Sequence, residues 1–170
     1  MAETKSFDPE AMLRVLDETG VRYVLIGGLA ATLHGSPHVT TDVDITPDPS
    51  LDNLKALAAA LDRLDARIRT EGEPDGLAFD RSAEFLTRAS ILNLTTRYGD
   101  LDLTFEPAGT RGYPDLRRRA VDIVIRGIDV PVAALADVIR SKEAAGREKD
   151  RLTLPTLRRL LARREGAQAD

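Results

Sequence analysis

Three aspartates carry the most specific chemical signal in the sequence. Asp42 and Asp44 flank one valine in a strand-like run, so both side chains project from the same face of that strand. Asp102 lies on the polar face of a second alternating run, residues 100–105. Carboxylates this close repel one another unless a cation lies between them, and Mg²⁺ prefers such oxygen ligands. The pattern predicts a Mg²⁺ site at Asp42 and Asp44 with Asp102 as the third acid. For the Asp-x-Asp pair alone, a solvated strand end is the alternative.

A glycine pair, Gly27-Gly28, follows the apolar run 23–26 and precedes a short Ala/Leu-rich segment. Backbone N–H groups at such a strand–helix turn can hold phosphate, although most glycine pairs are only turns. The chain has neither the P-loop motif nor the dinucleotide-binding glycine motif. The glycine turn followed by Asp-x-Asp therefore predicts a site for a nucleoside triphosphate (NTP) and its metal.

Alternating helical and strand periodicities must position these residues. A first helix is expected to begin at the Asp-Pro-Glu run at residue 8 and to end at Gly20. Ser50 is expected to cap a long helix. Residues 71–82, rich in Gly, Pro and Asp, are expected to form a loop. Pro155 is expected to break the last helical segment. The expected strands are 21–26, 40–46, 90–96, 101–105, 121–125 and 128–132, and the expected helices are 8–20, 29–34, 51–64, 133–145 and 147–164.

This order favours an α/β (α+β) fold, a mixed sheet with helices packed on one side. We expect one domain over residues 1–165, with a C-terminal helical portion at about 133–165 and a disordered tail at 166–170. The 170 residues include no cysteine, which excludes disulfides and a thiol nucleophile. The N-terminus lacks the apolar run of a signal peptide and no stretch is apolar enough to span a bilayer, so we expect a cytoplasmic protein without membrane contact. The net charge of −4 hides basic residues gathered towards the C-terminus.

Together these residues resemble the nucleotidyltransferase superfamily, marked by a Gly-Gly or Gly-Ser turn, Asp-x-Asp and a later Asp. The run Ser141-Lys142-Glu143-Ala144-Ala145-Gly146-Arg147-Glu148-Lys149-Asp150 resembles a block of the AbiEii-type nucleotidyltransferases. That group includes abortive-infection toxins and the MenT toxins, which add nucleotides to tRNA ends. The resemblance covers roughly residues 20 to 160 and implies a polymerase-beta-like nucleotidyltransferase fold.

The resemblance also implies residue roles. Gly27 and Gly28 would cradle the triphosphate and Thr41 would add a hydroxyl contact. Asp42, Asp44 and Asp102 would form the catalytic metal site. Lys142 and Arg147 would contact phosphates, and Asp150 would fix the lysine or assist the chemistry. For these last three, the alternative is an exposed, ion-paired helix.

Two positions depart from the pattern of many relatives: Gly28 stands in place of Ser, and His38 in place of Arg. Histidine is a weaker and pH-dependent phosphate contact. His34 fits a helix-end or packing role better than a ligand role. The basic clusters 117–119, 158–159 and 163–164 would grip an RNA backbone or form solvated helix faces.

Three functions follow from this pattern. The first is Mg²⁺-dependent transfer of a nucleoside monophosphate (NMP) from an NTP to an acceptor hydroxyl. In the toxin-like version, which the resemblance to AbiEii-type enzymes implies, the acceptor would be the tRNA 3′ end and an antitoxin protein would be a partner. The second is the same transfer to a small hydroxylated acceptor such as an antibiotic. The third is a degenerate protein that binds nucleotide or a partner without turnover, against which the presence of all three acids counts.

Overall fold

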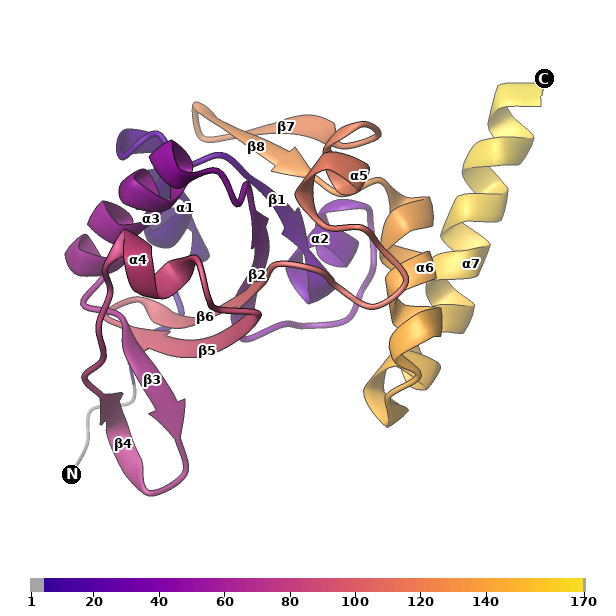
Figure 1. The fold of residues 1–170 in the computed structure, drawn as a ribbon. Helices are drawn as coiled ribbons and strands as arrows, with labels where there is room; N and C mark the ends of the chain where they lie inside the picture. The colour runs from indigo at the N-terminus through magenta and orange to yellow at the C-terminus, as the bar shows by residue number, and fades with distance from the viewer. Residues whose placement is uncertain (1–4, 170) are drawn as a thin grey trace.

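One eight-stranded mixed sheet organises the protein, in the order β4-β3-β5-β6-β2-β1-β8-β7. The computed structural model describes residues 5–169 (Figure 1). The strands are β1 (Tyr23–Ile26), β2 (Asp42–Pro47), β3 (Arg67–Thr70), β4 (Glu73–Leu77), β5 (Ile91–Thr96), β6 (Gly99–Thr104), β7 (Val121–Ile125) and β8 (Ile128–Val132). The mixed sheet and the two hairpins predicted for β5–β6 and β7–β8 are confirmed.

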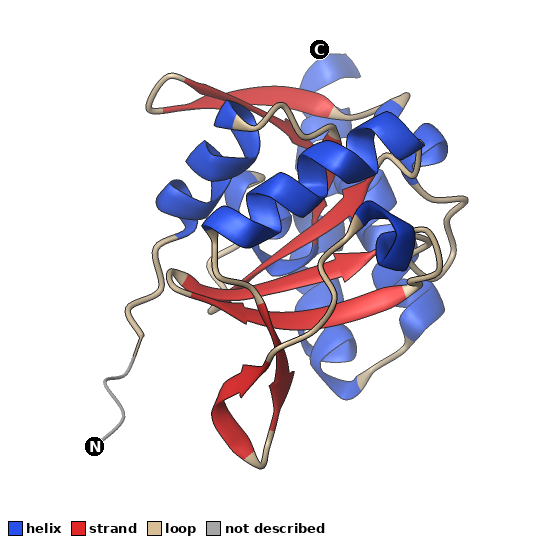
Figure 2. Cartoon of the chain, turned by 60° about the vertical axis from the view of Figure 1, so that its left-hand side comes forward, coloured by secondary structure: helices blue, strands red, loops and turns tan. Residues whose placement is uncertain are grey.

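Helices cover both faces of this sheet, whereas the sequence predicted helices on one side. The helices are α1 (Pro9–Glu18), α2 (Gly27–Leu33), α3 (Leu51–Arg63), α4 (Ala83–Leu86), α5 (Tyr113–Arg117), α6 (Leu135–Ala145) and α7 (Glu148–Ala169). Helices α1 and α3 lie on one face, and α2, α6 and α7 lie on the other (Figures 1 and 2). The central strand β1 is buried along Tyr23 to Leu25, as expected of a strand that is covered on both sides.

Local capping explains where the first helix begins and ends. The Asp8 carboxylate accepts a hydrogen bond from the Ala11 N–H at 3.0 Å, and Gly20 follows the helix at φ +73°. The capping hydrogen bond that the sequence predicted for Ser50 at the start of α3 does not form. Ser50 stands at the N-cap position, but its hydroxyl accepts a hydrogen bond from Arg22 and makes no capping bond to the helix.

Two segments differ from their predicted conformation. Five residues of the expected loop at 71–82 form strand β4 (Glu73–Leu77), which pairs with β3 as a hairpin at the edge of the sheet. Pro74 is tolerated because an edge strand leaves one side of its backbone unpaired.

Helix α7 runs through Pro155 and on to Ala169, where a break and a disordered tail were expected. Pro155 lies on the exposed side of α7, so solvent can reach the carbonyl that its missing N–H leaves unpaired. Asp170 lies outside the described residues.

No helix in the described part of the chain is both long and apolar enough to cross a membrane.

Candidate active site

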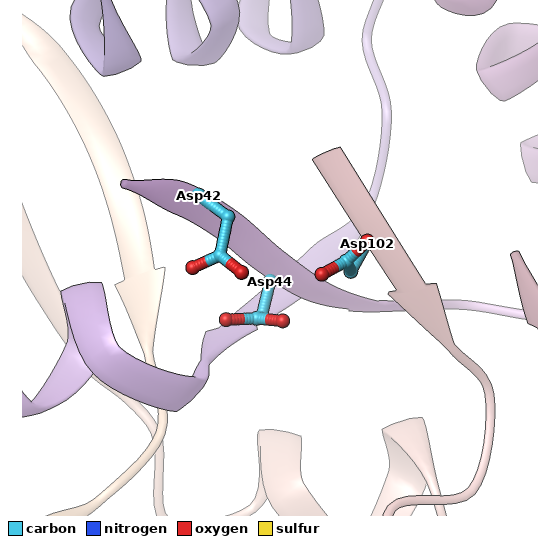
Figure 3. A group of neighbouring side chains, drawn as sticks. All are labelled: Asp42, Asp44 and Asp102. Atoms are coloured by element: carbon cyan, nitrogen blue, oxygen red, sulfur yellow. The ribbon is translucent and has the colours of Figure 1, made fainter. Parts of the chain in front are cut away.

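The three predicted acids meet on one face of the sheet. Strands β2 and β6 pair in parallel with Asp44 directly opposite Asp102, while Val43 and Leu101 between the acids are buried in the core. Figure 3 shows Asp42, Asp44 and Asp102 turned towards one another from these two strands. One oxygen from each carboxylate lies within 4.8 Å of the others. Strand alternation therefore places the three acids on one face, and the pairing of β2 with β6 brings them together.

The electrostatics of this cluster suit a cation. Burial, followed by the charges of Asp42 and Asp102, raises the pKa of Asp44 to about 7. Burial also raises the pKa of Asp102 to about 6, although the Arg69 guanidinium acts in the opposite direction. Hard carboxylate oxygens are what Mg²⁺ requires, and a divalent ion would relieve the repulsion that raises both values. The donor set therefore fits a Mg²⁺ site.

Helix α2 begins directly against this cluster. Gly27 has φ +70°, and a Cβ on it would lie 2.3 Å from Asp44 Oδ2, so the position requires glycine on both grounds. Gly28 is nearly as confined, because a Cβ there would lie 3.0 Å from Thr40 Oγ1. The glycine pair thus brings the first backbone N–H groups of α2 next to the acids.

Lys142 reaches the site from α6, and Arg147 reaches it from the connection between α6 and α7. Helix α6 ends at Gly146, which adopts the left-handed conformation at φ +62°, and α7 begins two residues later. Asp150, whose side chain is fully buried, joins the two cations. Its Oδ1 lies 3.2 Å from Lys142 Nζ, and its Oδ2 lies 2.8 Å from Arg147 Nε. Burial alone would raise the pKa of Asp150, but these hydrogen bonds outweigh it and lower the pKa. Asp150 is therefore placed to orient both cations.

A cavity of about 850 Å³ joins the acids, the glycine turn and the cations. Thr41, His38, Lys142 and Arg147 line it, and Asp150 lies behind the two cations. The exposed apolar side chains Val39, Ile91 and Leu152 also line the cavity, although they come from a loop, a strand and a helix. The volume falls within the range of ligand-binding clefts.

Four polar residues near the acids were not predicted as site residues. The Thr40 hydroxyl donates to Asp42 Oδ1 at 2.9 Å, and Arg69 Nη2 donates to Asp102 Oδ1 at 2.9 Å. Asn93 and Lys149 line the cavity. Lys149 belongs to the run 141–150 that resembles AbiEii-type enzymes, and Thr40 adjoins the strand that carries Asp42 and Asp44. The sequence could therefore have indicated both residues. Arg69 and Asn93 had none, because only the pairing of β3, β5 and β6 brings them near.

The basic clusters are largely engaged within the protein. Arg117, Arg118 and Arg119 each pair with an aspartate, at Asp122, Asp115 and Asp137 respectively. Arg158 pairs with Glu143 at 2.8 Å. These arginines are paired but still exposed, which favours solvated faces, the second of the two alternatives that the sequence left open.

His34 is a packing residue, as expected. It is buried, its Nε2 lies 2.7 Å from the Ala133 carbonyl oxygen, and Arg164 donates to its Nδ1 and to its carbonyl oxygen. Nε2 therefore carries the proton and Nδ1 accepts. Burial, together with the nearby Arg164, lowers the pKa of His34, which keeps the ring neutral. The contact ties α2 to α7.

Comparison with solved structures identifies the fold. A protein assigned as a nucleotidyltransferase, TM1012 from Thermotoga maritima, matches 96% of this chain and 99% of its own, with a TM-score of 0.55 and 15% identity. The lincosamide antibiotic adenylyltransferase LnuA, in its lincomycin-bound form, matches 92% of this chain and 99% of its own, with a TM-score of 0.59 and 15% identity. No protein-family model and no curated protein sequence matches the chain. The protein therefore has the nucleotidyltransferase fold, as its sequence predicted.

Proposed function

We propose that the protein is a Mg²⁺-dependent nucleotidyltransferase that transfers an NMP from an NTP to an acceptor hydroxyl. The observation that carries this proposal is the cluster of Asp42, Asp44 and Asp102 on two paired strands, with Gly27 directly against Asp44. The nucleotidyltransferase fold supports it. In this reaction the acceptor oxygen bonds to the α-phosphorus, the bond to the β-phosphate bridge breaks, and pyrophosphate leaves.

The three aspartates have different roles in this reaction. Asp42 and Asp44 hold Mg²⁺, and Thr40 keeps the Asp42 carboxylate in place through its 2.9 Å hydrogen bond. Bound Mg²⁺ supplies stabilisation of the negative charge that develops on the phosphates. Asp102 completes the metal site and accepts the proton of the acceptor hydroxyl. Its Oδ1 already accepts from Arg69, so Oδ2 is the oxygen left for that task.

The triphosphate lies between the glycine turn and the cations. The backbone N–H groups at Gly27 and Gly28 and the hydroxyl of Thr41 bind phosphate oxygens on one side. Lys142 and Arg147, held by Asp150, neutralise the leaving pyrophosphate on the other. Because Asp150 is buried behind these cations, its role is to position them, and it does not contact the substrate.

For the acceptor, we propose the 3′ end of tRNA, in a toxin of a toxin–antitoxin system whose antitoxin would be a second protein. The resemblance of residues 141–150 to AbiEii-type enzymes supports this acceptor. So do Lys149, Arg159 and Arg163, which are exposed at helical spacing along α7 from the cavity outwards.

A small hydroxylated molecule is the second candidate acceptor. Two observations favour it: the apolar residues Val39, Ile91 and Leu152 around the cavity, and the pairing of Arg117 to Arg119 with aspartates. The similar LnuA structure is that of an adenylyltransferase bound to lincomycin. A protein that binds nucleotide without turnover would show neither kind of transfer.

Label transfer separates these functions. The pure protein is incubated with Mg²⁺ and each α-labelled NTP, with either total RNA or a panel of hydroxylated antibiotics. Label on tRNA supports the first acceptor, and label on a small molecule supports the second. Asp44→Ala should abolish transfer, whereas Asp129→Ala, an exposed strand aspartate on β8, should not. No label on any acceptor, together with no Mg²⁺-dependent NTP binding, would refute the catalytic proposal.

A further inference from the structure

Arg69 contacts the acidic cluster from β3, a strand without any motif that connects it to the three acids. Its Nη2 lies 2.9 Å from Asp102 Oδ1, and its Nη1 lies 3.2 Å from Asp100 Oδ2. Nη1 also donates to the Leu94 carbonyl oxygen at 3.2 Å. Among the described residues, Arg69 is the one cation within ion-pair distance of Asp42, Asp44 or Asp102.

The sheet register directs this side chain across β5. Arg67 and Ile68 pair with Thr95 and Leu94, so the next residue, Arg69, faces Asn93, which in turn pairs with Asp102. Asp102 pairs with Asp44. Arg69, Asn93, Asp102 and Asp44 therefore form one row on one face of four neighbouring strands, with the cation at one end and the metal-binding acid at the other.

A bulge lies opposite Arg69. The register between β3 and β4 shifts between Ile68 and Thr70, and Gly76 in the bulged segment has φ +75°. A Cβ on Gly76 would lie 2.8 Å from the Ile68 carbonyl oxygen, so only glycine fits there. Bulges of this kind re-aim the side chain opposite them and often lie near active sites. The geometry of the β3–β4 hairpin thus favours a direction of the Arg69 side chain across β5, towards Asp102.

We propose that Arg69 is a positioning residue for transfer, which holds Oδ1 of Asp102 so that Oδ2 faces the acceptor hydroxyl. A single exposed ion pair would have little effect, but this fork bridges two carboxylates and a carbonyl oxygen, and the Asp102 side chain is only 13% exposed. The inference rests on the proposed nucleotidyl transfer and adds to it the residue that orients the third acid.

Arg69 should affect metal binding and turnover in opposite directions. Its positive charge competes with a metal ion for Asp102, so removing it should tighten metal binding. Removing the Arg69 guanidinium also frees the Asp102 carboxylate to rotate. A catalytic group that is displaced by about 1 Å can lower the rate about 10²-fold. Damage that merely loosened the fold would weaken both metal binding and turnover.

The experiment compares Arg69→Ala, Arg69→Lys and Arg67→Ala in the full chain. Arg67 lies on the same strand and bonds to the Gly76 carbonyl oxygen, so its variant controls for damage to the hairpin. Mn²⁺ binding to the protein alone is followed by electron paramagnetic resonance. Label transfer is followed as a function of NTP concentration, with the acceptor that the wild type labels.

Arg69→Ala should bind Mn²⁺ about fivefold to tenfold more tightly than the wild type, because a competing charge has gone. Its transfer kcat should fall about 10²-fold with little change in the KM for NTP. Arg69→Lys keeps the charge but loses the fork, so Mn²⁺ affinity should return to that of the wild type while kcat stays low. Arg67→Ala should match the wild type in both measurements.

The inference is overturned if Arg69→Ala transfers label at the wild-type rate, or if it binds Mn²⁺ more weakly than Arg67→Ala does. A failure of the proposed function gives a different result, in which the wild type itself transfers no label. The Mn²⁺ comparison then still decides whether Arg69 acts on the acidic cluster. Equal affinity in Arg69→Ala and Arg67→Ala would show that it does not.

Discussion

Replacing Gly27 by alanine should disable the metal site without unfolding the protein. The new Cβ would lie 2.3 Å from Asp44 Oδ2, where ordinary contact begins at 3.4 Å, so the carboxylate must move by about 1 Å. A displacement of this size in a catalytic group can lower the rate about 10²-fold. The left-handed backbone at φ +70° adds a strain of about 1–2 kcal/mol. We therefore expect Gly27→Ala to fold, to lose most Mn²⁺ affinity and to lose transfer.

Gly20→Ala is the matched control. Gly20 has φ +73°, close to the φ of Gly27, but a Cβ there meets nothing within 4 Å. It carries the strain without the clash. Gly20→Ala should therefore lose less stability in urea unfolding than Gly27→Ala does, and only Gly27→Ala should lose Mn²⁺ binding, followed by electron paramagnetic resonance. If Gly27→Ala binds Mn²⁺ as well as Gly20→Ala does, the contact between α2 and Asp44 is not what shapes the site.

Three further predictions concern charge and packing. The pKa values of Asp44 and Asp102 in the folded protein are about 7 and about 6, above the ordinary aspartate pKa of about 4. Their protonated forms therefore stabilise the fold fully below about pH 4, and this stabilisation is lost as the pH rises through 7. The metal-free Tm should therefore fall over that range, and added Mg²⁺ should raise Tm, on the order of 5 °C, at pH 8 but not at pH 5. An equal Mg²⁺ effect at both pH values would contradict the raised pKa values. Asp150→Ala should lower the free energy of unfolding by about 3 kcal/mol, because it leaves the largely buried Lys142 unpaired, and Asp150→Asn should cost less. Urea unfolding measures both, and equal losses would argue against the ion pairs. Arg164→Ala removes two hydrogen bonds to the buried His34 and should cost about 1–3 kcal/mol, whereas the exposed neighbour Arg163→Ala should stay within about 0.5 kcal/mol. Similar thermal unfolding of these two variants would show that His34 does not tie α2 to α7.

The face on which each acid lies could be predicted because it depends on local alternation, whereas the pairing of β2 with β6 that joins Asp102 to the other two acids was implied only by the family resemblance. Asp42 and Asp44 share a face by the two-residue period of a strand, and Asp102 has the same period on β6. The glycine pair was informative for a similar reason, since a strand that turns directly into a helix needs the freedom of Gly27.

Features that depend on distant pairing could not be predicted. Arg69 reaches Asp102 only because β3 joins the sheet beside β5, and the Gly- and Pro-rich composition of β4 concealed the hairpin. The sequence predicted that Gly146 separates two helices, and the resemblance implied that Asp150 fixes Lys142, but that the same buried carboxylate also holds Arg147 could not be predicted. The pairing of Arg117 to Arg119 with aspartates also depends on tertiary contacts. In each case the sequence identifies the residue type but not its partner.

The central claim is that one site holds both the metal and the triphosphate of an NTP. Anomalous diffraction from a crystal grown with Mn²⁺ and a non-hydrolysable NTP analogue tests it most directly. We expect a manganese peak among the carboxylates of Asp42, Asp44 and Asp102, with the triphosphate against the backbone at Gly27 and Gly28. A manganese peak away from these three carboxylates, or a triphosphate bound elsewhere on the protein, would contradict it.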